Sequence, residues 1–560
     1  MRSALRDYAP VLGVAAFTLL LKAYGPVSSP VIGALDPWGW VAFVREFLRT
    51  GETSPFFFLT GYPPTYSYVV AAISSTGIDA YDVIRYMPIV SFLEVIPIYL
   101  LSIYAFNSRA ISVLSAVLAV TARYHFMRTS LGIPEAAAQA LLAMTLLFVA
   151  WSLDTGRWKH RTCAALLMAA TLLYYHFTFV ILIPFLAILP TLMVKQRRAT
   201  FSIVMSILVP ATLLAGGVWY FRVADNIIRT YLLERHYDYP VPVGGSPLFM
   251  LGFSVGKFGV LAASNLGYLL LVSGAIGFVY SLLGKDKTVP RAGRNFLATY
   301  LLVLGFSAIV LVALSVFTGA RGASSVYMFS WLAMPLSVFA SYAFVKGTIG
   351  VHNILAHASF IPPARTVRRV LVVILILFVC VVNLSAANYY KAWSGNGLGF
   401  MAAHYSYKCL TDNEYYGLQY IRDNSPTNSI VLTVGVEDPI LAYHVMVSRR
   451  TTVSIKQLRT EAGHIVADVE AAYDGMTPRN FTMRIDFDSS SGQQVYLMLG
   501  IKTVSLDVAT NIREPPPENA LMEGLLKNDL IRNAQCEYVY ENHQITLLRI
   551  SSVTIEFQTP

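Results

Sequence analysis

The chain has 560 residues, of which 55% are hydrophobic and only 13% are charged, and its mean hydropathy is +0.55. Soluble domains contain roughly a quarter charged residues, so this composition excludes an ordinary soluble globular protein. A helix that crosses a bilayer needs about 20 mostly apolar residues, and the sequence contains many such runs. The predicted fold class is a polytopic α-helical membrane protein with about 11–13 spans.

The formal net charge of +10 is unevenly distributed along the chain. Residues 388–560 contain 14 basic and 19 acidic side chains, so the positive excess lies in the rest of the sequence. Basic residues in loops between apolar segments indicate membrane orientation, and they are a poor reason to expect a nucleic-acid partner.

Apolar segments of helical length follow one another through the first 387 residues. They lie near 10–26, 84–106, 110–122, 135–152, 163–175, 177–194, 201–221, 259–283, 295–317, 325–346 and 370–387. We expect the first to be a span and not a cleaved signal peptide, because no small-residue cleavage site follows it before Asp36.

The basic clusters all fall before the first apolar segment or after an even-numbered one. They are Arg2 with Arg6, Arg109, residues 157–161, 195–198, 284–294 and 362–369. The positive-inside rule then places the N-terminus and these loops in the cytoplasm. By parity, the other loops and the C-terminal part lie outside, in a multi-pass protein of the cell membrane.

The C-terminal part, residues 388–560, alternates helical patterns with β-branched runs such as "SIVLTV" and "QITLLRI". This alternation predicts an extracytoplasmic α/β domain. We therefore expect two domains, a transmembrane catalytic domain over 1–387 and the α/β domain over 388–560. Cys409 and Cys536 lie in the second domain, where they either pair in a disulfide or stay as two thiols.

Unusual charged residues collect in the loops predicted to lie outside. The principal ones are Asp36, Glu135, Glu234 and Arg321, with Trp38, Arg128 and His236 near them. Two separated carboxylates can hold a hard divalent cation, and a cation with an arginine can neutralise a phosphate leaving group. A further carboxylate can orient or deprotonate an acceptor. This set is suited to transfer of a group from a lipid-phosphate donor.

Each of the four principal residues also has an ordinary structural interpretation. Asp36 precedes Pro37 and is placed to cap an amphipathic helix, and Glu135 follows Pro134 in the first turn of another helix. Glu234 fits a solvated loop charge, and Arg321 fits an arginine that reaches the lipid headgroups. We expect neither Asp36 nor Glu135 to lie in an apolar core.

Several stretches resemble motifs of the catalytic subunit of oligosaccharyltransferase, a membrane glycosyltransferase of the GT-C superfamily. The stretches are "LDPWGWVAFVREFLRTGE" (35–52), "YPPTYSYV" (62–69), "RTSLGIPE" (128–135), "LLERHYDYP" (232–240), "GARGASSVYMFSWLAMP" (319–335) and "GLQYIRDNSPTNSIVLT" (417–433). They occur in the family's order and extend from one end of the chain to the other.

The resemblance implies roles for individual residues. Asp36 and Glu135 would bind Mg²⁺ or Mn²⁺, Glu234 would help to hold the metal or the acceptor, and Arg321 would bind the donor phosphate. Arg128, His236 and Trp38 would contact substrate.

One motif of the family is missing. Where the family has Trp-Trp-Asp-Tyr-Gly, which reads the acceptor's Ser or Thr, this chain has "VGVEDPILAYH", residues 434–444. The acceptor, or the way it is recognised, is therefore expected to differ.

The implied function is transfer of a sugar or oligosaccharide from a polyprenyl- or dolichyl-phosphate-linked donor to a protein or glycan acceptor at the outer face. A nearer alternative is a transferase that uses a polyprenyl-phosphate monosaccharide and acts on a protein hydroxyl, a lipid or a glycan. Alternatives of another class are a transporter or flippase and an inactive paralogue. Transporters often place charged residues near the bilayer midplane, whereas the charges here lie at its outer boundary.

Overall fold

The structure is a computed structural model. It describes residues 2–28, 30, 36–60, 62–192, 197–228, 266–283, 291–318, 328–357, 367, 370–371, 373–374, 410–434, 436, 444–461, 464–471, 494–501, 505–507, 511–513 and 536–550.

The chain divides into two compact units. The first comprises Met1–Gly25 and Phe43–Tyr389, and the second comprises Pro26–Ala42 and Tyr390–Pro560. We call them the helical unit and the α/β unit. The predicted boundary between 387 and 388 lies outside the described residues and stays a prediction.

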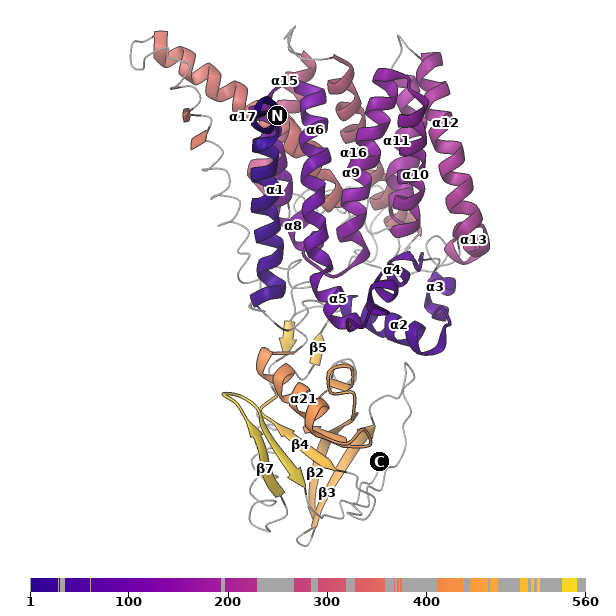
Figure 1. Ribbon diagram of the computed structural model, residues 1–560, viewed down its shortest axis with the longest axis vertical. Helices are drawn as coiled ribbons and strands as arrows, with labels where there is room; N and C mark the ends of the chain where they lie inside the picture. The colour runs from indigo at the N-terminus through magenta and orange to yellow at the C-terminus, as the bar shows by residue number, and fades with distance from the viewer. Residues whose placement is uncertain are drawn as a thin grey trace. The chain divides into compact units, whose positions relative to one another are not determined.

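The helical unit is a bundle of long apolar helices (Figure 1). Its long elements are α1 (Arg2–Ser28), α6 (Val95–Phe106), α7 (Arg109–Thr121), α9 (Pro134–Thr155), α10 (Trp158–Tyr174), α11 (Thr178–Leu192), α12 (Arg197–Ala215), α15 (Tyr268–Leu283), α16 (Arg291–Thr318) and α17 (Met328–His357). Apolar sequence forms helices here because a helix satisfies every backbone polar group within one segment.

The predicted apolar segments between residues 10 and 346 are helical over nearly all of the residues that the structure describes. Five helical stretches in the described part are long and apolar enough to cross a membrane. They are Ala80–Phe106, Pro134–Thr155, Arg198–Ala224, Ala292–Leu311 and Ser330–Ile354. The prediction of a multi-pass helical membrane protein is confirmed in this respect.

Shorter helical elements join these long helices. They are α2 (Asp36–Thr50), α3 (Pro55–Thr60), α4 (Thr65–Ser74), α5 (Ala80–Tyr86), the 3₁₀ segment η1 (Met87–Glu94), α8 (Arg123–Thr129), the π-helical turn η3 (Gly216–Tyr220) and α13 (Phe221–Ile228). Helices α3, α4, α5 and α13 lie together at one end of the bundle, which we call the short-helix end (Figure 1).

Local sequence explains how several of these helices begin and end. Asn107 adopts a left-handed conformation at the end of α6, and the Ser108 side chain then accepts a hydrogen bond from the backbone N–H of Ile111 to start α7. Gly156 ends α9 in the same left-handed conformation, with φ of 63°. These residues determine the sharp reversals that make consecutive helices antiparallel.

Close packing of α15 on α17 depends on a missing side chain. A Cβ atom at Gly277 would overlap the backbone carbonyl of Phe339. Small residues at helix contacts are typical of membrane bundles, where packing rather than expulsion of water brings helices together.

The α/β unit contains a six-stranded sheet with strand order β3-β2-β1-β4-β8-β7. The strands are β1 (Ile430–Val434), β2 (Thr451–Glu461), β3 (His464–Ala471), β4 (Val495–Leu499), β7 (Cys536–Glu541) and β8 (Thr546–Ile550). Strand β1 is parallel to β2 and β4, and the other pairs are antiparallel. Every residue of β1 and β4 is buried, as expected for central strands.

Two further elements complete the described part of the unit. Helix α21 (Asp412–Asn424) begins with a capping box, and β5 (Ser505–Asp507) pairs with β6 (Asn511–Arg513) in a small separate ladder. The predicted α/β composition of the C-terminal part is confirmed, and β7 and β8 pair as an antiparallel hairpin.

Candidate functional site

Glu135 lies in the first turn of α9, at the short-helix end of the bundle. Pro134 starts the helix, and Ile133 before it provides no side-chain cap. A carboxylate suits this position because the first turn has backbone N–H groups without intrahelical partners. The Glu135 side chain is fully buried, with 0% exposure. The expectation that it lies outside a core was therefore wrong.

Arg128, at the end of α8, is the charge partner of Glu135. Its Nε donates a hydrogen bond of 2.5 Å to Oε2 of Glu135, and its Nη2 contacts the same oxygen. The Arg128 side chain is also buried. Since α8 and α9 are joined by a turn of four residues, two predicted site residues that are seven positions apart come into direct contact.

The Arg128–Glu135 contact leaves one carboxylate oxygen unused. Both arginine nitrogens act on Oε2, while Oε1 is buried and has no hydrogen-bond partner among the described residues. Buried polar atoms are nearly always satisfied, and exceptions are often found at functional sites. Oε1 of Glu135 is thus an acceptor that is held in place and available to a further group.

The turn between α8 and α9 is held by groups from other helices. The Tyr66 hydroxyl of α4 donates to the carbonyl of Gly132 at 2.8 Å, and the Ser91 hydroxyl of η1 donates to the carbonyl of Thr129 at 3.2 Å. A Cβ at Gly132 would overlap the backbone of Ile84. The turn therefore packs tightly at a position where only glycine fits.

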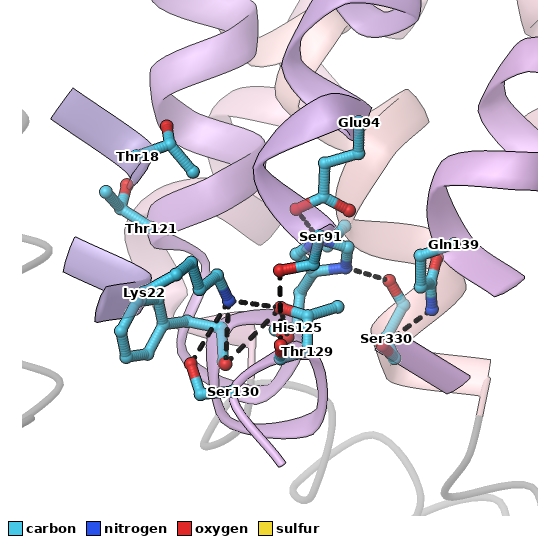
Figure 2. Close-up of polar contacts among 12 residues, drawn as sticks. Thr18, Lys22, Ser91, Glu94, Thr121, His125, Thr129, Ser130, Gln139 and Ser330 are labelled. Atoms are coloured by element: carbon cyan, nitrogen blue, oxygen red, sulfur yellow. Dashed lines mark hydrogen bonds and ion pairs between the residues drawn. The ribbon is translucent and has the colours of Figure 1, made fainter. Parts of the chain in front are cut away.

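A second buried group of charges lies beside this turn (Figure 2). Nδ1 of His125 donates to the carbonyl of Ser330 at 3.0 Å, and its Nε2 lies 3.0 Å from Oε1 of Glu94. Lys22 of α1 reaches the end of α8 from the other side. All three charged side chains are at most 1% exposed.

The His125 ring is oriented by its contact with α17. Because a carbonyl only accepts, Nδ1 of His125 is the donor of the hydrogen bond to Ser330. Nε2 of His125 lies close to the Glu94 carboxyl, but neither Nε2 nor either Glu94 oxygen has a hydrogen-bond partner among the described residues.

Sequence reasoning missed Lys22, Glu94 and His125. Lys22 and Glu94 are isolated charges inside apolar runs, "LLLKAYG" and "SFLEVIPIYLL". A lone charge in a membrane span is a signal for a functional or paired group, and that signal was present. The partners of these charges could not be read, since they come from distant segments.

An aromatic cluster adjoins the site at the short-helix end. The ring of Tyr62, from the predicted Tyr-Pro-Pro stretch, packs edge-on to that of His176 at 4.4 Å between centroids. Tyr175 stacks at 6.0 Å on Trp331, the residue after Ser330. The stretches quoted from residues 62–69 and 319–335 therefore contribute to one region of the fold.

The remaining predicted site residues have different outcomes. Trp38 lies in α2 and is fully buried. Asp36 is the first residue of α2, but its side chain lies outside the described part. Glu234, His236 and Arg321 lie in ranges that the structure does not describe. The roles predicted for these residues stay predictions.

Glu135 is one described residue that fits a metal ligand. Its buried Oε1 is an oxygen donor of the kind that Mg²⁺ and Mn²⁺ prefer. No three His, Cys, Asp or Glu side chains gather into a candidate metal cluster within the described ranges. A cation would need further ligands, and the sequence predicts Asp36, whose side chain lies outside the described part.

No family model and no curated protein matches the chain. Among solved structures, it is similar to the oligosaccharyltransferase of Archaeoglobus fulgidus, solved in complex with Zn and sulfate, with 14% identity and a TM-score of 0.43. That match covers 78% of this chain and 62% of the other, which is less than two thirds of its length. The chain is also similar to ArnT from Cupriavidus metallidurans, solved with undecaprenyl phosphate, with 13% identity, a TM-score of 0.47 and 98% coverage of both chains.

Proposed function

We propose that this chain is a membrane glycosyltransferase of GT-C type that transfers a sugar or oligosaccharide from a polyprenyl- or dolichyl-phosphate-linked donor to an acceptor at the outer membrane face. The observation that carries the proposal is the buried Arg128–Glu135 pair with its open carboxylate oxygen. The stretch "RTSLGIPE", which resembles a motif of the oligosaccharyltransferase family, contains both residues, and the fold brings them into contact.

The chemistry of the proposed reaction is a displacement at the anomeric carbon. The acceptor forms a bond to this carbon, the bond from carbon to the phosphate oxygen breaks, and the lipid phosphate leaves with the electron pair. Negative charge therefore grows on the departing phosphate, and groups already oriented towards it accelerate the reaction. Arg321 is proposed to bind that phosphate, and Glu234 to orient or deprotonate the acceptor.

Glu135 and Asp36 are the residues proposed to hold a divalent cation, which would neutralise the charge on the departing phosphate. Arg128 keeps the Glu135 carboxylate oriented, because both of its contacting nitrogens act on Oε2. This leaves Oε1 as the oxygen that is proposed to face the cation.

The test is a transfer assay on membranes that contain the protein. Labelled polyprenyl-phosphate monosaccharide and lipid-linked oligosaccharide are supplied in separate arms, each with protein, glycan and lipid acceptors. We expect transfer with one donor class, its loss in EDTA and its recovery with Mg²⁺ or Mn²⁺. An Arg321→Lys variant should weaken use of the donor, because lysine lacks the planar bidentate geometry of arginine.

Transfer that persists unchanged in EDTA would overturn the metal proposal, and absence of transfer from both donors would overturn the proposed function. An acceptor arm with Asn-x-Thr and Asn-x-Ala peptides tests the missing Trp-Trp-Asp-Tyr-Gly motif. We expect little discrimination between the two peptides, since a pocket that binds a substrate hydroxyl otherwise discriminates by roughly 10⁴-fold.

A further inference from the structure

An ammonium group from α1, a helix distant in sequence, contacts helix α8 and the turn after it. Nζ of Lys22 donates to the carbonyl of Phe126 at 3.2 Å and to the hydroxyl of Ser130 at 3.1 Å, and it also donates to the hydroxyl of Thr129 (Figure 2). An ammonium has three donors, so these bonds use all of them. Lys22 also lies 4.2 Å from the ring centroid of Phe126.

The position of these contacts along the chain is informative. They lie on both sides of Arg128, at Phe126 and at Thr129 and Ser130, and the Arg128 guanidinium contacts Glu135. The Ser130 backbone N–H bonds to the same Phe126 carbonyl, and Thr129 returns its hydroxyl to the carbonyl of His125. Lys22 of α1 therefore stabilises the last turn of α8 through hydrogen bonds from another helix.

Contacts from two other elements also hold α8 at His125. His125 connects α8 to Ser330 of α17 and to Glu94 of η1. Polar contacts thus hold the helix at His125 and again at residues 126–130, so little freedom remains for the backbone of Arg128.

A buried lysine is an expensive way to fill space. Removing an ammonium from water costs several kcal/mol, and a methionine of similar length would pack an apolar bundle without this penalty. The structure shows why a charge is useful here: its three bonds are made to a segment that carries site residues, not to its own helix.

We propose that Lys22 is a positioning residue for the Arg128–Glu135 pair. It fixes the backbone of residues 126–130, so that the Arg128 guanidinium stays on Oε2 of Glu135 and Oε1 stays open. The role of Lys22 in turnover rests on the proposed function, whereas its effect on the backbone does not.

The first arm of the test measures structure without activity. Amide hydrogen exchange is followed in the purified, full-length protein for wild type and for Lys22→Met, which keeps the length of the side chain. We expect exchange at Ser130, Leu131 and Ile133 to become at least tenfold faster, with the middle of α9 unchanged. The matched control is Thr18→Val, one turn away on α1, because the Thr18 hydroxyl is buried and bonds only within its own helix, to the carbonyl of Val14.

The second arm measures turnover in the transfer assay. A misplacement of about 1 Å can cost roughly 10²-fold in rate. We expect Lys22→Met to lower kcat by about that factor and to change the donor KM by less than about threefold. In an Arg128→Gln background, Lys22→Met should cost less than about threefold more, because groups that act through one another are not additive. Thr129→Val, which removes one of the three acceptors, should show the same pattern with a smaller loss and serves if Lys22→Met does not fold.

Unchanged exchange at residues 130–133 in Lys22→Met would overturn the proposal. So would an equal loss of kcat in the wild-type and Arg128→Gln backgrounds, since that is the result of general destabilisation. If Arg128→Gln alone leaves transfer intact, the proposed function of the pair has failed, and the exchange data still decide whether Lys22 orders the turn.

Discussion

Two buried glutamates, one in each unit of the molecule, differ in how their oxygens are used. Glu135 in α9 and Glu414 in α21 both lie in the first turn of a helix, and both are 0% exposed. Oε2 of Glu414 accepts from the backbone N–H of Thr411 at 2.6 Å, and its Oε1 accepts from Nε2 of Gln544 at 3.3 Å. Glu135 has both of its Arg128 contacts on one oxygen and none on the other among the described residues.

This difference separates a structural carboxylate from a candidate reactive one. Glu414 completes a capping box, and its bonding capacity is used within the fold. Oε1 of Glu135, in contrast, is buried without a hydrogen-bond partner among the described residues, which is energetically unfavourable. Both carboxylates are fully buried in the first turn of a helix, Glu135 as its second residue and Glu414 as its third, and their partners differ.

The largest effect that we expect is loss of transfer activity in Glu135→Gln. The amide accepts from Arg128 on one side but offers no charge to a cation, so kcat should fall by about 10³-fold, as for removal of a strong electrostatic group at a reacting centre. Stability should fall as well, because Arg128 stays buried without a counter-charge. The measurement is the transfer assay together with thermal unfolding of the purified protein.

The matched control for this variant is Glu414→Gln. It should retain transfer within about threefold and lose about 1 kcal/mol of local stability at α21, the size of a helix-cap effect. Equal activity of Glu135→Gln and Glu414→Gln would remove the functional distinction between the two carboxylates.

Arg450 is a second buried charged residue of the α/β unit that can be compared with Glu135, because it has several backbone partners. Its guanidinium donates to the carbonyls of Arg422, Ser425 and Arg449 and to the Ser425 hydroxyl. We expect Arg450→Met to lower the free energy of unfolding of this unit by about 3 kcal/mol, since hydrogen bonds of charged groups contribute about 1.5–3 kcal/mol each and several are lost. Hydrogen exchange at residues 412–434 would show it, and transfer by the folded fraction should be unchanged.

His444 differs from Glu414 and Arg450, because it is a buried polar side chain of the α/β unit without a described hydrogen-bond partner. It is fully buried, neither ring nitrogen has a hydrogen-bond partner in the described ranges, and desolvation lowers its pKa to about 3. The unfolded chain, with a histidine pKa near 6.5, therefore binds a proton more readily than the folded unit. The stability from this group is complete above about pH 6.5 and declines as pH falls towards 3.

Between pH 7.5 and pH 5.0 this linkage should cost about 2 kcal/mol. Hydrogen exchange or thermal unfolding at the two pH values measures it, and His444→Phe should remove most of the difference. An α/β unit that is equally stable at both pH values would contradict a neutral, buried His444.

Much of the helical architecture could be predicted because it depends on local sequence. Apolar runs of sufficient length form helices in a bilayer whatever their neighbours are, and Pro134, Ser108 and Gly156 locate helix ends by backbone chemistry alone. The C-terminal strands were predictable for a similar reason, since their β-branched runs alternate with helical patterns.

The candidate site was predictable only in part. The sequence identified Arg128 and Glu135 as separate site residues, one for substrate and one for metal, but it did not indicate that they touch. Lys22, Glu94 and His125 were passed over, although two of them are lone charges in apolar runs. Contacts between residues that are 31 and more than 100 positions apart, such as His125–Glu94 and Lys22–Phe126, depend on which helices pack together.

The sequence by itself determined the class of the protein, the number and place of its apolar segments and the residue types available for chemistry, because hydrophobicity and backbone preference act over a few residues. Tertiary structure alone decided which of those residues meet, which become buried and which carboxylate oxygen stays open. The reason is physical: the cost of burying a charge and the geometry of its partners are set by side chains from distant segments. The Thr411–Glu414 capping box is a local sequence pattern, whereas the contact of Glu135 with Arg128 and its open oxygen appear only in the folded structure.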